Sequence, residues 1–188
     1  MRRGLRRSLI GPLVLAAAWA AASCGGGGGG GGTPGPTQPT PSIIFTPAGP
    51  AGAGSLSLAP GPGTTATVLE LQVRVTQVTN LYGVAFDLTY PTAVLDFDAP
   101  VEGTFLAMPG AGQTSLQVVE ATPGRLVVGL TRLGALAGAS GSGNLVSLSF
   151  TAVAAGSQPI AFAQNTAYDS TGQAQALSWV AGSVTVVR

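Results

Sequence analysis

The chain has 188 residues, of which 45% are hydrophobic and only 8% are charged. It contains one cysteine, no histidine and no lysine, and its length fits a single domain of ordinary size. This composition excludes an intrachain disulfide, metal sites built from histidine or several cysteines, and catalysis by Ser-His-Asp triads, Cys-His pairs or lysine Schiff bases.

The first residues have the pattern of an export signal. Four arginines within residues 1–7 precede an apolar run over residues 9–22, which is shorter than the ~20 residues that a membrane-spanning helix needs. The run ends in Ala21-Ala22-Ser23-Cys24, which resembles the lipobox of bacterial lipoproteins. The resemblance implies a signal peptide over residues 1–23 and a lipid on Cys24, hence an exported protein anchored to a membrane of the cell envelope. An ordinary secretory peptide is the alternative, and Sec and twin-arginine export both stay open.

Residues 24–54 are predicted to form a tether. Eight glycines at residues 25–32 make a flexible coil, and the Pro/Thr-rich residues 33–41 make a stiffer, extended spacer. Residues 42–45, Ser-Ile-Ile-Phe, fit either a short extra strand or a linker segment. The main domain is therefore expected at residues 55–188.

The charge behind the signal peptide is mildly acidic. From residue 24 onward, four arginines stand against seven acidic residues, a net charge of −3. Such a surface lacks the basic stripe that nucleic acid needs, so nucleic acid is not expected as a partner.

From residue 55, apolar and polar residues alternate with a period of two, which is typical of strands with one buried face. No window has a helical period, and Pro/Gly or Gly/Ser turns separate the alternating segments. The pattern predicts an all-β, antiparallel β-sandwich of eight or nine strands. The clearest segments are residues 67–76, 84–90, 126–131, 146–151, 160–162 and 184–186.

The order of these segments resembles the cohesin domain, the module that captures dockerins in cellulosomes and related bacterial assemblies. The match is best at residues 80–95, with weaker similarity at residues 103–106, 123–128 and 143–150. It covers about residues 55–188 and implies a nine-stranded jelly-roll sandwich. One outer face, from strands three, five, six and eight, would bind a dockerin.

On that face the resemblance implies a set of partner-binding residues. They are Gly83, Ala85, Asp87, Thr89, Val119, Arg125 and Val127. Cellulosomal cohesins use polar residues early in strand three to grip the dockerin, and Gly83 and Ala85 cannot make those hydrogen bonds. The outward rows are small and apolar, which favours a protein-contact surface. The alternative, that small residues merely keep the strand exposed without cost, stays open.

Polysaccharide binding is the alternative function, because cohesins share their architecture with carbohydrate-binding modules. Sugar rings stack on exposed aromatic rings, and Tyr82, Tyr168 and Trp179 are the candidates near strand ends. Asp96 and Asp98 could share one face of a strand as calcium ligands, but calcium needs six or more oxygen ligands. No metal and no cofactor are expected. We expect a non-catalytic binding module on the cell envelope that presents a dockerin-type docking face.

Overall fold

The computed structural model describes residues 40–107 and 113–188, which form ten β-strands and no helix. None of these residues belongs to a helix that could cross a membrane. The predicted signal peptide, Cys24 and most of the predicted tether lie outside the described residues. The strands are β1 (Ser42–Pro47), β2 (Ser55–Pro60), β3 (Val68–Thr89), β4 (Leu95–Glu102), β5 (Thr114–Thr122), β6 (Arg125–Arg132), β7 (Ala139–Ala152), β8 (Gly156–Asp169), β9 (Ser178–Val180) and β10 (Gly182–Val187).

The long strand β3 takes part in both layers of the sandwich. Its first half pairs with β2 and β7, and its second half pairs with β6 and β8. Between the halves, Gln77 and Asn80 have positive φ angles of 46° and 54°, and the register with β7 shifts. The sequence predicts two strands here, at residues 67–76 and 84–90. They form one bent strand instead, because residues 77–80 contain no glycine or proline and bend through bulges rather than a turn.

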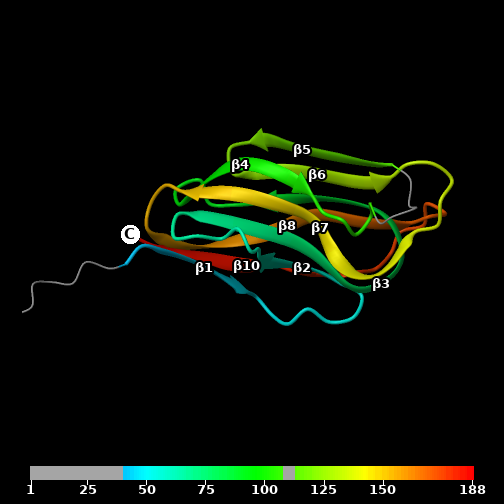
Figure 1. Cartoon of the computed structure of the whole chain (residues 1–188), viewed down its shortest axis with the longest axis horizontal. Coiled ribbons are helices and arrows are strands. Elements are labelled where there is room, and N and C mark those ends of the chain that lie inside the picture. Colours follow the sequence, from blue (N-terminus) through cyan, green and yellow to red (C-terminus); the bar gives the residue numbers. More distant parts are fainter. Residues whose placement is uncertain (1–39, 108–112) are drawn as a thin grey trace, which may run out of the picture. The chain divides into compact units, whose positions relative to one another are not determined.

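Two strand orders follow from the pairing. One layer runs β9-β2-β3-β7-β4, and the other runs β8-β3-β6-β5. The first residues of β8 also pair with β10, which in turn pairs with β1. Figure 1 shows β3 through the middle of the fold, with β5 and β6 on one side of it and β1 and β10 on the other. The predicted all-β sandwich is confirmed.

The core fills the space between the layers, as the alternation predicts. The inward rows of β3 are fully or nearly fully buried, including Leu71 and Phe86. Aromatic rings pack against each other in this core. The centroids of Phe86 and Phe162, on neighbouring strands of one layer, are 5.3 Å apart, and those of Tyr90 and Phe150, from the two layers, are 5.0 Å apart.

Residues 42–45 belong to a strand rather than to a linker. All of β1 pairs antiparallel with β10, and Ile43 and Phe45 are buried in the core. The folded part therefore reaches further toward the N-terminus than residue 55.

Candidate functional site

The outer face of the β8-β3-β6-β5 layer carries the residues that the sequence predicts for partner binding. Alternate residues of a strand point to the same side of a sheet, so the register fixes which side chains are neighbours on this face. Each row runs across the sheet in the strand order β8, β3, β6, β5. Three adjacent rows are Tyr168–Gly83–Thr131–Ser115, Thr166–Ala85–Gly129–Gln117 and Ala163–Asp87–Val127–Val119. All seven predicted contact residues lie on β3, β5 and β6 of this layer.

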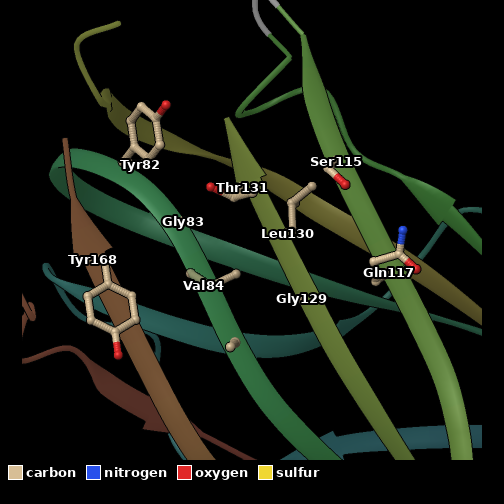
Figure 2. Close-up of a pocket in the computed structure, with 10 residues that line it drawn as sticks. Tyr82, Gly83, Val84, Ser115, Gln117, Gly129, Leu130, Thr131 and Tyr168 are labelled. Atoms are coloured by element: carbon tan, nitrogen blue, oxygen red, sulfur yellow. The ribbon is translucent and has the colours of Figure 1, made fainter. Parts of the chain in front are cut away.

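A hollow of about 320 Å³ lies over the first two of these rows. It forms because Ala85 and Gly129, which the register brings side by side, carry no side chain beyond Cβ. The surrounding positions carry larger side chains, among them Tyr82, Ser115, Gln117, Thr131 and Tyr168 (Figure 2). No residue that lines the hollow has a formal charge, so a charged group placed there would lose water without gaining a counter-ion.

Two tyrosines stand at one end of the hollow, near the β3 backbone at Gly83 (Figure 2). The hydroxyl of Tyr82 donates a hydrogen bond to the carbonyl of Gly134, which fixes its ring. Tyr168 lies opposite Gly83 on β8 and is 41% exposed.

The third aromatic of the polysaccharide alternative lies elsewhere. Trp179 is partly buried against the core, with its ring centroid 5.2 Å from that of Phe162 and 5.8 Å from that of Phe86. The structure therefore brings Tyr82 and Tyr168 to one hollow but does not add Trp179 to them.

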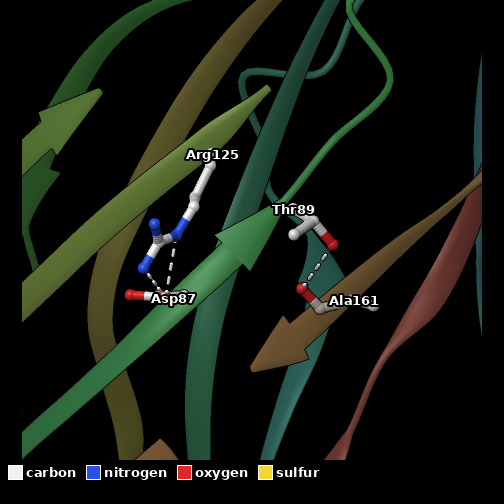
Figure 3. A network of polar contacts seen from close by, with 4 residues as sticks. All are labelled: Asp87, Thr89, Arg125 and Ala161. Carbon is white, nitrogen blue, oxygen red and sulfur yellow. Dashed lines mark hydrogen bonds and ion pairs between the residues drawn. The ribbon is translucent and has the colours of Figure 1, made fainter. Parts of the chain in front are cut away.

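An ion pair joins two of the predicted contact residues. The Arg125 guanidinium donates to Asp87 Oδ2 from Nη2 at 2.6 Å and from Nε at 2.9 Å (Figure 3). The Asp87 side chain is only 8% exposed, whereas that of Arg125 is 42% exposed. Beside the pair, Thr89 donates to the carbonyl of Ala161 at 3.2 Å, which ties β3 to β8. Arg125, which faces Thr89 in the next row, neutralises Asp87, the only charge of the three rows, and covers it from solvent.

The β5–β6 side of the face is apolar and open. Val119 and Val127 lie opposite each other and are 56% and 39% exposed. The face thus combines an uncharged hollow, a neutralised ion pair and an exposed valine pair. The sequence shows the same period of two for Gly129, Gln117 and Thr131, but only the register reveals that they complete the hollow.

One carboxylate adds a side-chain contact between the end of β3 and the β5–β6 hairpin, beside the β3–β6 ladder. Glu120 accepts a hydrogen bond from the Tyr90 hydroxyl at 2.5 Å and another from the Gly124 N–H at 3.2 Å. Burial, this hydrogen bond and the nearby charge of Glu120 together raise the pKa of Tyr90 to about 12. The hydroxyl therefore stays protonated and donates throughout the neutral range.

The weak calcium candidate does not gather more ligands. Asp98 accepts a hydrogen bond from Thr151 at 2.8 Å, and within residues 40–107 and 113–188 no group of three or more acidic residues could hold a metal ion.

Comparisons with known proteins point to one family. The family model described as the cohesin domain matches residues 62–186. A search of curated proteins found no match.

Solved structures show the same fold. The sixth cohesin of scaffoldin B from Acetivibrio cellulolyticus, solved in complex with a Cel5 dockerin, is 17% identical with a TM-score of 0.58, and the match covers 70% of this chain and 97% of that chain. A type II cohesin from the cellulosome of the same organism is 14% identical, with a TM-score of 0.57 and coverage of 71% and 95%. A non-cellulosomal cohesin from the hyperthermophilic archaeon Archaeoglobus fulgidus is 16% identical, with a TM-score of 0.51 and coverage of 76% and 88%.

Proposed function

The chain belongs to the cohesin family, and on this premise we propose that it is a non-catalytic adaptor whose β8-β3-β6-β5 face captures a dockerin-type protein. The observation that carries the proposal is the composition of this face, where small residues form the floor of an uncharged hollow and two exposed valines lie beside it. The cores of protein interfaces are likewise depleted in charge. The dockerin bound by a structural neighbour from Acetivibrio cellulolyticus supports a protein as the partner class.

The way the face would hold a partner follows from its side chains. Gly83 and Ala85 have no hydrogen-bonding side chains, so along this part of β3 the affinity for a partner comes from shape and from apolar area removed from water. The exposed Val119 and Val127 add apolar contact, and the Asp87–Arg125 pair supplies polar contact at the edge of that patch. A partner helix with small and apolar residues on its contacting side fits this surface better than one with charged residues.

We also propose that the module is exported and tethered to a membrane of the cell envelope through Cys24. The lipobox-like Ala21-Ala22-Ser23-Cys24 and the glycine- and proline-rich residues 25–41 support this, because together they would make a lipid anchor and a spacer. The test is mass spectrometry of the mature protein. A diacylglyceryl mass on the Cys24 peptide is expected, and Cys24→Ser should release the protein from the membrane fraction. An unmodified Cys24 peptide would reject the anchor.

Polysaccharide binding is the second candidate, and one observation favours it. Tyr82 and Tyr168 border the same hollow as Gln117, whose amide could bond to sugar hydroxyls. It ranks second because Trp179 packs into the core.

The experiment uses residues 38–188, which form one compact unit that contains the whole described core. Calorimetric titration with a panel of purified dockerins runs beside sedimentation with insoluble cellulose and chitin. Saturable binding to a dockerin, lost when calcium is chelated, is expected. Sedimentation with a polysaccharide and no dockerin binding would favour the second candidate, and the absence of both would reject the face as a docking surface for these ligands.

A further inference from the structure

The sheet edges of this molecule differ in how they are protected against pairing with another chain. Within the described residues, β1, β4, β5 and β9 each pair with one strand only. β9 has three residues, β1 ends in Pro47, and β4 carries two aspartates, a proline and a glutamate. Short length, proline and charge are the usual protections of an edge strand. β5 has nine residues, and residues 114–119 contain no charge, glycine or proline.

The hydrogen-bond register shows which backbone groups of β5 point outward. The Leu133 N–H donates to the Gln113 carbonyl at 2.7 Å, and Gln113 and Leu133 continue the register in which Ser115 faces Thr131. Hydrogen-bonded and non-hydrogen-bonded pairs alternate along an antiparallel ladder. The odd-numbered residues of β5 therefore exchange hydrogen bonds with β6, and the even-numbered residues turn their N–H and C=O groups away from it.

The side chains agree with this assignment. Leu116 and Val118 pack against the core, while Gln117 lines the hollow on the outer face and Val119 is exposed beside it. Leu116 and Val118 thus have their side chains held inward and their backbone groups directed at the open edge. In the described part of the chain, no further strand covers that edge.

We propose that this edge pairs with the same edge of a second copy of the chain, antiparallel and about a twofold axis at Gln117. In this register Leu116 faces the second copy's Val118, and both are even-numbered residues that can donate across the edge. Gln117 then faces its own equivalent as a non-hydrogen-bonded pair. Glu120 faces Thr114, whose hydroxyl donates a hydrogen bond to Glu102 of its own copy, and the Glu120 carboxylate is already engaged by Tyr90.

A second copy suits this edge because residues 114–119 of both strands would meet without a charge, glycine or proline among them. One sequence supplies both sides of a closed, twofold interface, as in most homodimers. The dimer would continue the β8-β3-β6-β5 sheet into the second copy and place the two hollows on one surface, with the two Gln117 residues between them. Two faces side by side would raise the avidity for a partner that carries two binding segments. This inference stands whether the face binds a dockerin or a polysaccharide.

A cysteine scan in the unit of residues 38–188, which lacks Cys24, tests the register. Directly opposed residues of a non-hydrogen-bonded pair have Cα atoms about 4.5 Å apart, which suits a disulfide. Gln117→Cys should form a covalent dimer under mild oxidation. Ser115→Cys and Val119→Cys are matched controls, because each is displaced from its own equivalent by ~13 Å along the strand. Neither variant alone should form a disulfide-linked dimer, and the two variants mixed should cross-link.

Sedimentation equilibrium over a range of protein concentrations tests the dimer without a covalent bond. The unaltered unit should dimerise reversibly. Gln117→Lys should weaken dimerisation at least tenfold because two lysines would meet at the axis, whereas Ser115→Lys, opposite a valine, should weaken it much less. Circular dichroism checks that both variants fold. A unit that stays monomeric at every concentration, or a Gln117→Cys variant that cross-links no faster than Ser115→Cys, would overturn the proposal.

Discussion

The Tyr90 hydroxyl and the Glu120 carboxylate, 2.5 Å apart, connect the end of β3 to the β5–β6 hairpin. The same carboxylate accepts the N–H of Gly124, a turn residue with a φ of 84° that glycine adopts without strain. This contact adds to the β3–β6 ladder in holding the hairpin, which supplies Gln117, Gly129 and Val127 to the docking face.

Tyr90→Phe should lower the free energy of unfolding by about 1.5–3 kcal/mol at pH 8, because it removes a hydrogen bond to a charged group. The folded-state pKa of Tyr90, about 12, lies above its ordinary value of 10.0, so the hydrogen bond contributes fully below pH 10 and is lost as the pH rises through 12. Urea unfolding at pH 8, 10 and 11 measures this. The difference in the free energy of unfolding between wild type and Tyr90→Phe should narrow above pH 10. As a control, Tyr168→Phe, on the exposed face, should lower the free energy of unfolding far less. A difference in unfolding free energy that widens with pH would contradict the raised pKa of Tyr90.

Arg125→Met should destabilise the fold by about 2 kcal/mol, because it leaves the covered Asp87 carboxylate without its counter-ion. The loss of unfolding free energy should be smaller than for a fully buried ion pair, because the Arg125 side chain is 42% exposed. The double variant Asp87→Asn/Arg125→Met should recover at least half of this loss. Urea unfolding of both single variants and the double variant gives the coupling. Additive losses would mean that the two side chains do not stabilise each other.

Gly129→Leu should fill the hollow without disturbing the fold. A Cβ at Gly129 meets no atom within 4 Å, so the new side chain occupies open space. The melting temperature should stay within a few degrees of wild type, while affinity for a dockerin should fall at least tenfold, about 1.4 kcal/mol. Gly49→Leu is the matched control, because its Cβ also meets nothing and the residue lies in the loop before β2. Equal affinity for the Gly129→Leu and Gly49→Leu variants would exclude the hollow from the binding site.

Trp179→Ala should act on stability rather than on binding. Its ring packs edge-on to Phe162 and is tilted against Phe86, so truncation should cost about 3 kcal/mol. The folded fraction should bind its partner with unchanged affinity in calorimetry. Tyr168→Ala should show the opposite pattern, with little loss of stability and weaker binding. If Trp179→Ala weakened binding at full stability, the polysaccharide alternative would gain support.

Local patterns in the sequence predict the faces of this fold well. Alternation over residues 84–90 and 126–131 fixes which side chains point outward, because that property depends only on the strand itself. No local sequence pattern determines which distant segments pair with each other. Asp87 and Arg125 are 38 residues apart, and only the β3–β6 register shows that they form an ion pair.

Other features depend on context in the same way. The hollow exists because the register sets Ala85 beside Gly129, and each of them alone reads as an ordinary small residue. β1 is a strand because it finds β10 at the far end of the chain, which Ser42-Ile43-Ile44-Phe45 cannot reveal by itself. The sequence places Trp179 near a strand end as a sugar-stacking candidate, whereas its contacts with Phe86 and Phe162 hold it against the core.

The most direct test of the docking face is amide chemical-shift mapping of residues 38–188, labelled with ¹⁵N and titrated with a dockerin that the unit binds. The account predicts the largest shift changes at Gly83, Ala85, Val127 and Gly129, with the outward positions of β2 and β7 unchanged. Changes confined to the β9-β2-β3-β7-β4 layer, or to loops away from the hollow, would contradict it.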